Sequence, residues 1–194
     1  QRAVPKSEYR RSFSLYFFDN KTGDPSKDWI AAAIPVLLEA DLGQDPFLTI
    51  RSPFDAYPVD RLRSAGFKSW EDAPWTFKQR LANDSHMGFL VTGSFAMEGG
   101  EYVVTRALHE APSGRLVAEK THRNKSVFAL VDDMSVELKR DLNVPLVQTE
   151  TSKDLPVAEI STSSVEALED IALGSRKAAI DHDWAGSIAL FEKA

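Results

Sequence analysis

Residues 88–123 read GFLVTGSFAMEGGEYVVTRALHEAPSGRLVAEKTHR. They contain three short runs rich in β-branched and aromatic residues, separated by a Gly-Gly pair at 99–100 and a Pro-Ser-Gly step at 112–114. Such steps are typical of turns between antiparallel strands. The stretch therefore predicts a meander of antiparallel hairpins, and the alternation of residue types along its middle run predicts that one face is drier than the other.

The segments before this meander alternate between strand and helix patterns. Residues 12–18 (SFSLYFF) predict a buried strand, and residues 46–51 (PFLTIR) predict a second one. Between these two strands, apolar residues follow helical spacing up to Leu42. We expect Ser26 to cap this helix, and Pro35 to kink it or to make its first turn irregular.

Three further helices complete the expected domain. Residues 59–65 predict a short helix, and residues 69–84 predict a longer one with Ser69 as its cap. After the meander, apolar residues at spacings of three and four predict a helix over residues 126–143. This order of elements predicts an α/β domain, α+β-like in character, with a mixed β-sheet of about five strands packed with helices.

Changes in composition divide the chain into four parts. Residues 1–11 are rich in basic residues and contain a proline, as is typical of a linker, and residues 12–144 hold the α/β domain. Residues 145–163 show no periodicity and predict a second linker. Residues 164–194 predict two helices that form a C-terminal hairpin.

Composition also limits the classes of function. The net charge of −6 argues against a nucleic-acid platform, which usually has a basic stripe. The absence of cysteine excludes disulfides, thiolate metal sites and cysteine nucleophiles. No apolar run approaches the roughly 18 residues of a transmembrane helix. Any membrane attachment is therefore expected only through a segment outside this chain.

We find no motif for catalysis, for a cofactor or for a metal ion. A phosphate-binding loop needs several glycines and a Gly-Lys-Ser/Thr step, whereas residues 20–25 place Lys21 before a single glycine. We expect this loop to be a structural turn. No two histidines have metal-ligand spacing. His109 and His122 are expected on separate strands of one hairpin and could meet there; surface or edge positions are the preferred interpretation.

The tryptophans are the remaining candidates for a functional surface. Trp70 and Trp75 share a segment with Pro74 close to an expected loop, and Trp184 belongs to the C-terminal hairpin. We select these three tryptophans as a candidate interaction surface. The alternative is that they pack in the core or between helical repeats, as large aromatic residues commonly do.

Several ordered pieces of the sequence resemble the TolB-like amino-terminal domain of bacteria. In that family a strand ends in a turn similar to F-x-N-x-[ST]-G-D, an aromatic residue follows near the start of a helix, and a V-x-G-S-[FY] strand comes later. The resemblance covers roughly residues 12–143 of this chain. The matching positions are 18–24, Trp29, 91–95, 111–114 and 128–132.

The C-terminal hairpin resembles the first helix pair of a tetratricopeptide array. Trp184, Phe191 and Ala194 match the second helix of such a unit, whereas Ser175 and Ser187 stand where glycine and alanine are usual. One repeat cannot bury its own apolar face. We therefore expect further repeats after this hairpin, or a partner that covers its open side.

Together these resemblances imply a non-catalytic sensor or protein-interaction module of a larger bacterial signalling or envelope protein. The implied parents are receptor-like kinases, cyclases and transcriptional regulators, often anchored in a membrane. The expected partner is a protein or peptide bound through the helical repeats, or a second copy of the chain. A periplasmic or otherwise extracytoplasmic place is expected, with a cytoplasmic one as the alternative. A small-molecule-binding periplasmic domain, an envelope transport or assembly accessory protein, and an enzyme are the other hypotheses.

Overall fold

The computed structural model describes residues 10–144 and 155–194. The expected linker at 1–11 lies almost entirely outside these residues, and most of the expected linker at 145–163 does too. Among the described residues, no helix is both long enough and apolar enough to span a membrane.

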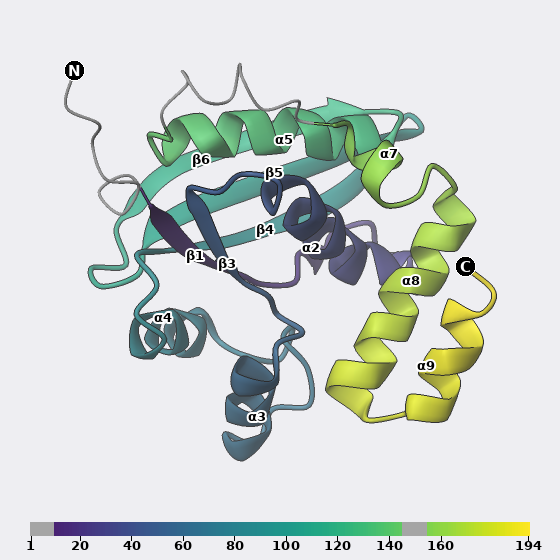
Figure 1. Cartoon of the computed structure of the whole chain (residues 1–194), viewed down its shortest axis with the longest axis horizontal. Coiled ribbons are helices and arrows are strands. Elements are labelled where there is room, and N and C mark those ends of the chain that lie inside the picture. Colours follow the sequence, from purple (N-terminus) through teal and green to yellow (C-terminus); the bar gives the residue numbers. More distant parts are fainter. Residues whose placement is uncertain (1–9, 145–154) are drawn as a thin grey trace.

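A mixed, six-stranded sheet forms the centre of the molecule, which confirms the predicted fold class (Figure 1). The strands run in the order β3-β1-β4-β5-β6, and the short β2 also pairs with β4. Strand β1 is parallel to both of its neighbours, whereas β4, β5 and β6 form the predicted antiparallel meander. The strands are β1 (Arg11–Leu15), β2 (Asp19–Asn20), β3 (Leu48–Arg51), β4 (Phe89–Glu98), β5 (Glu101–Glu110) and β6 (Leu116–Asn124).

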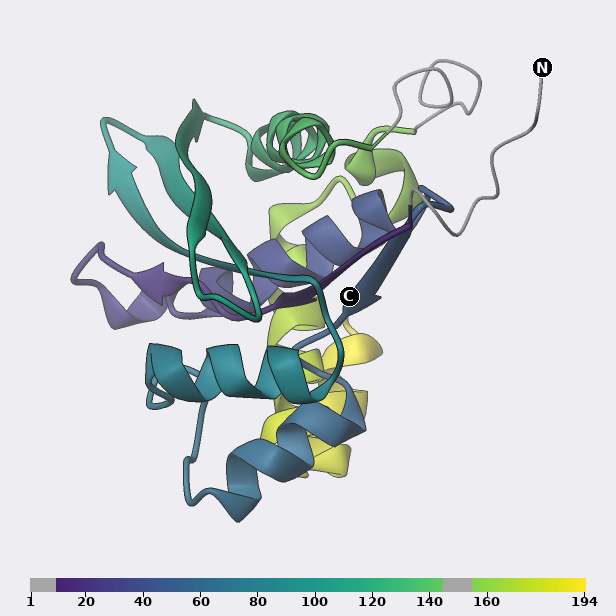
Figure 2. The same ribbon diagram turned by 90° about the vertical axis from the view of Figure 1, so that its left-hand side faces the viewer.

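Helices cover both faces of this sheet. Figure 2 shows α2 and α5 on one side of it and α4 on the other. Arg106 of β5 pairs with Asp141 of α5, whereas His109 of the same strand contacts Trp75 of α4. The helices of this part are η1 (Pro25–Lys27, a 3-10 turn), α2 (Trp29–Leu42), α3 (Ala56–Ser64), α4 (Trp75–Asp84) and α5 (Val127–Asp141).

Helix α2 is apolar nearly all round because it is covered by the sheet, by α5 and by the C-terminal helix α8 (Val165–Arg176). It runs through Pro35 as one helix. Proline has no N–H, so the Ala31 carbonyl one turn earlier loses its helical donor. The backbone N–H of Phe18, between β1 and β2, donates to this carbonyl at 3.2 Å and joins that segment to the helix.

Two predicted helix caps are wrong. Ser26 lies inside the turn η1, and the carboxylate of Asp24 accepts from its N–H, because Pro25 favours the first position of a helical turn. Ser69 does not cap α4, which begins only at Trp75. Pro74 explains this late start, since a proline disfavours helical conformation in the residue before it.

The C-terminal part packs against the α/β domain (Figure 1). The short helix α7 (Val157–Ile160) falls within the expected second linker; Val157 is buried, and its N–H donates to Asp132 at 2.8 Å. Helix α8 continues into the π-helical turn η2 (Lys177–Asp181), and α9 (Trp184–Phe191) folds back along α8. Gly174 lies at this crossing, where a Cβ atom would come within 2.7 Å of the Phe191 ring.

Candidate functional site

The loop at residues 20–25 is held by its own hydrogen bonds. The Asn20 amide donates to the Asp24 carbonyl at 3.0 Å and to the Asp28 carboxylate at 2.7 Å, and its oxygen accepts from the Thr22 N–H. A side chain that bonds its own loop in this way is typical of an Asx-type turn. These hydrogen bonds give the polar residues of the loop a structural role that needs no ligand.

The two histidines of the meander do not meet. In register, His109 pairs with Leu90 of β4 and His122 with Val104 of β5. His109 faces α4, whereas His122 lies on the side of Arg106 and α5, so the sheet separates the two rings. Burial lowers the pKa of both imidazoles. Within residues 10–144 and 155–194, no three His, Asp or Glu side chains gather as a metal site would require.

The three candidate tryptophans have different environments. Trp70 is fully buried, and its indole N–H donates to the Pro53 carbonyl at 2.9 Å. Its ring also meets Tyr16 edge-on, with 5.1 Å between the ring centroids. Trp70 is therefore a core residue and not part of an interaction surface. Trp75 is 37% exposed and Trp184 is 62% exposed, and each of them borders a different pocket.

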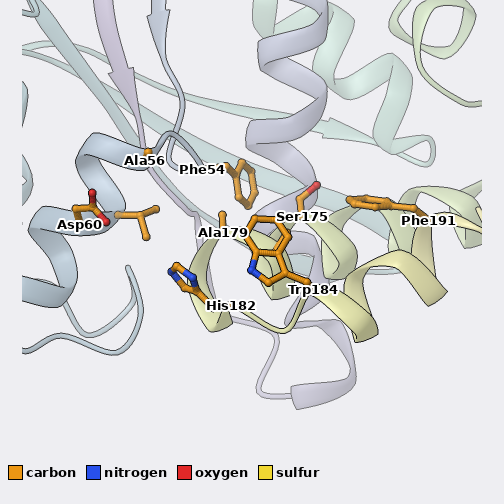
Figure 3. A pocket seen from close by; sticks show the side chains of 10 residues that line it. Phe54, Ala56, Asp60, Ser175, Ala179, His182, Trp184 and Phe191 are labelled. Carbon is orange, nitrogen blue, oxygen red and sulfur yellow. The ribbon is translucent and has the colours of Figure 1, made fainter.

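The first of these pockets, the hairpin pocket, lies between α3 and the C-terminal helices and encloses about 400 Å³. Figure 3 shows its lining side chains gathered around one space, with Trp184 in the middle and Asp60 and Phe191 at opposite ends. Most of the lining is apolar. Its main members are Phe54, Val59, Asp60, His182, Trp184 and Phe191.

Helix α9 extends this apolar surface beyond the pocket. Trp184, Ile188 and Phe191 are 62%, 57% and 45% exposed. Ser187 is the only residue of this helix that is buried. A helix that is apolar on most of its surface is normally covered on most sides. Among the described residues, the main contacts of α9 are with α8 and η2, on the side where Ser187 is buried.

The second pocket, the sheet pocket, lies between α4 and the sheet and encloses about 360 Å³. In register, Thr92 and Ser94 of β4 are opposite Ala107 and Thr105 of β5, and Ala107 is opposite Glu119 of β6. Strand alternation places these side chains on one face. The side chains that line the pocket include Phe17, Asp19, Lys21, Glu71, Trp75, Lys78, Thr92, Ser94, Thr105 and Glu119.

Lys78 is the unusual member of this set. It is only 8% exposed, and burial lowers the pKa of its ammonium group. The ammonium nitrogen lies 6.0 Å from the centre of the Tyr16 ring. It makes no hydrogen bond or ion pair with any residue in the described part of the chain. Sequence reasoning missed this residue, because a single lysine within a helix carries no local signal of burial.

Comparisons with known proteins give similarity of structure only. No family model and no curated protein matches the chain. The C-terminal domain of LpoB from Escherichia coli is similar, with a TM-score of 0.47 and 9% identity over 59% of this chain and 82% of that one. Lipoprotein GNA1162 from Neisseria meningitidis has a TM-score of 0.44 and 14% identity, over 69% of this chain and 98% of that one.

TolB from Acinetobacter baumannii is also among the similar structures. Its TM-score is 0.43 and its identity 12%, over 69% of this chain but only 28% of that protein. Likeness at this level carries no function from one protein to another, because one fold hosts many functions.

Proposed function

We propose that this chain is a non-catalytic protein-interaction module of a bacterial envelope protein. The observation that carries the proposal is the exposed apolar surface of α9 together with the hairpin pocket beside it. Exposed apolar surface of this kind marks a protein-binding site, because leaving it in water is unfavourable. The envelope setting comes from the sequence resemblance, and within that setting we favour an accessory role in assembly over a signalling receptor.

The partner surface that fits best is an α-helix. Trp184, Ile188 and Phe191 have the i, i+4, i+7 spacing with which one helix packs against another. The hairpin pocket lies beside this stripe, since Trp184 and Phe191 also line it, and it can receive a large apolar side chain. Asp60 lines the pocket and makes no ion pair with another described residue, so a basic residue on the partner would complement it.

This surface is also where a tetratricopeptide array would continue. In such arrays the second helix of one unit packs against the first helix of the next. We propose that α8 and α9 form a unit of this kind. The exposed face of α9 would then receive a helix with the same chemistry, whether it comes from a partner protein or from a further repeat.

A designed peptide tests the proposal. The probe is a helical peptide of about 20 residues with leucines at i, i+4 and i+7 and lysines on the flanks. We expect it to bind the wild-type chain with a dissociation constant below about 100 μM in isothermal titration calorimetry. The Trp184→Ala variant should bind it at least about tenfold more weakly, because tryptophan commonly dominates such interfaces.

Two controls make the test specific. Val136→Ser removes a similarly exposed apolar residue of α5 and should leave binding unchanged. A peptide with glutamates in place of the lysines should bind about tenfold more weakly if Asp60 contributes. Failure of the lysine peptide to bind, or equal binding to the wild type and to Trp184→Ala, contradicts the proposal. Self-association through α9 in sedimentation runs would show that a second copy is the occupant instead.

A further inference from the structure

We propose that the sheet pocket binds a small organic carboxylate that also carries a hydroxyl or ammonium group. This site lies on the α4 side of the sheet, away from the apolar surface of α9, and does not depend on the function proposed above. Its volume of about 360 Å³ is within the range of small-molecule sites.

The anion-binding group is Lys78. Its side chain lines the pocket and is nine-tenths buried, yet it makes no hydrogen bond or ion pair with a described residue. Burial of most of this side chain disfavours its charged form, and the nearby charges of Asp19 and Glu71 offset this only in part, since the pKa of Lys78 stays lowered. A ligand carboxylate would offset the rest with a charge-assisted hydrogen bond.

The fold holds Lys78 in place from two sides. The Tyr16 hydroxyl donates to the Lys78 carbonyl at 2.7 Å, which ties this turn of α4 to the segment after β1. The Tyr16 ring also lies 6.0 Å from the ammonium nitrogen. Trp75, one helical turn earlier, packs edge-on against His109 with 5.4 Å between the ring centres. The pocket therefore has a positioned cation and an aromatic wall before any ligand arrives.

The other charges of the pocket select the type of anion. Asp19 is paired with Lys21 at 3.4 Å, and Glu71 with Arg176 at 2.7 Å. Glu119 has no ion pair with a described residue. Because Asp19 and Glu71 are already paired, Glu119 is the carboxylate left to repel an anion, and it repels a dianion such as phosphate more than a monoanion. Glu119 and the nearby hydroxyls instead suit a single carboxylate whose remaining groups donate hydrogen bonds.

Two kinds of molecule have this chemistry, and the test separates them. The probes are serine and glycine as amino acids, and lactate and gluconate as hydroxy acids. Inorganic phosphate and glycerol serve as the negative probes. Binding is followed by nuclear magnetic resonance, from the shifts of the backbone amides of Thr92, Ser94 and Thr105. We expect saturable shifts with at least one carboxylate below about 10 mM, and none with either negative probe.

Variants identify the groups that bind. Lys78→Met keeps most of the length of the side chain and removes its charge, and it should weaken binding of the carboxylate at least about tenfold. Lys68→Met, an exposed lysine elsewhere, should have no effect. Glu119→Gln should weaken amino acids more than hydroxy acids, because an ammonium group gains most from a carboxylate.

Three outcomes overturn the proposal. The first is that no carboxylate gives saturable shifts. The second is equal binding to the wild type and to Lys78→Met, provided that the spectrum of the variant shows it to be folded. The third is that phosphate binds as well as the carboxylates, which would show a general attraction of anions to Lys78 and not a site for this class of ligand.

Discussion

At the residue scale, two buried cations, Arg106 and Lys78, have contrasting surroundings. Arg106 is fully buried beneath α5, where Asp141 pairs with it at 2.6 Å. Lys120 joins the same carboxylate at 3.0 Å. Lys78 of α4, which packs on the opposite face of the sheet, has no such ion pair with a described residue. Arg106 is therefore explained by the packing of α5, whereas Lys78 is left for a ligand.

Asp141→Asn should show how much Arg106 depends on its partner. Burial of the Asp141 carboxyl opposes its ionisation, but the hydrogen bonds from Arg106 and Lys120 outweigh this effect and hold its pKa below the usual 3.8. We expect the variant to lose about 3 kcal/mol of stability in urea denaturation at pH 7, since it leaves a buried charge poorly compensated.

The pH dependence of this loss has a defined sign. A carboxylate with a lowered pKa in the folded state stabilises above its unfolded pKa, and the contribution disappears as the pH falls through the folded value. The cost of Asp141→Asn should therefore shrink as the pH falls below 3.8. Glu98→Gln, which breaks the exposed pair with Arg123, is the matched control and should cost less than about 1 kcal/mol. An equal cost for both variants would show that burial is unimportant here.

At the scale of elements, single positions decide how helices meet. The missing N–H of Pro35 lets α2 accept a hydrogen bond from Phe18. Gly174 in turn lets α9 approach α8 closely enough for the Phe191 ring to rest on its backbone. The geometry of the exposed apolar surface therefore depends on a glycine that is itself outside that surface.

Gly174→Val should loosen α9 without unfolding the domain. The added side chain meets the Phe191 ring, and overpacking of this kind costs about 1–3 kcal/mol. We expect the amides of residues 184–191 to exchange with solvent about tenfold faster or more, while those of α5 keep their protection. Ala189→Val adds the same side chain at an exposed position of α9 and should change little. Unchanged exchange in Gly174→Val would mean that the ring moves aside freely.

At the scale of the whole molecule, the C-terminal hairpin and the α/β domain share one core. Leu168, Ala172 and Ile180 belong to the same buried cluster as the residues of α2. Arg63 of α3 donates to the carbonyls of Ala179 and Ile180 at 3.2 and 2.6 Å, which fixes η2 to the domain. The wall of the hairpin pocket is thus formed by segments more than one hundred residues apart.

This shared core predicts cooperative unfolding. In native-state hydrogen exchange, the amides of α8 should open with the same free energy as those of β4, because exposing α8 also uncovers α2. The amides of α9 should open at a lower free energy, because Ser187 is the only buried residue of this helix and little apolar surface holds it in place. If α8 exchanged early while β4 stayed protected, the hairpin would be a separate folding unit and the pocket would not be rigid.

Much of the fold was predictable from the sequence because its signals are local. The Gly-Gly and Pro-Ser-Gly steps mark the turns of the meander, and helical spacing marks α2 and α5. The serine-cap pattern at Ser69 predicts too early a start for α4, because Pro74 restricts the residue before it and the helix begins only at Trp75. Local rules compete with one another there, and the backbone geometry of proline prevails.

The sequence by itself determined the fold class, the two-helix ending and the chemical types of residue available to bind a partner. Tertiary structure alone decided which of these candidate side chains are accessible. Trp70 is covered by Tyr16 and Pro53, Trp184 is left exposed, and Lys78 is buried beside strands whose hydroxyl groups face it. The physical reason is that burial depends on contacts between residues distant in the chain, whereas periodicity and turn chemistry depend on neighbours.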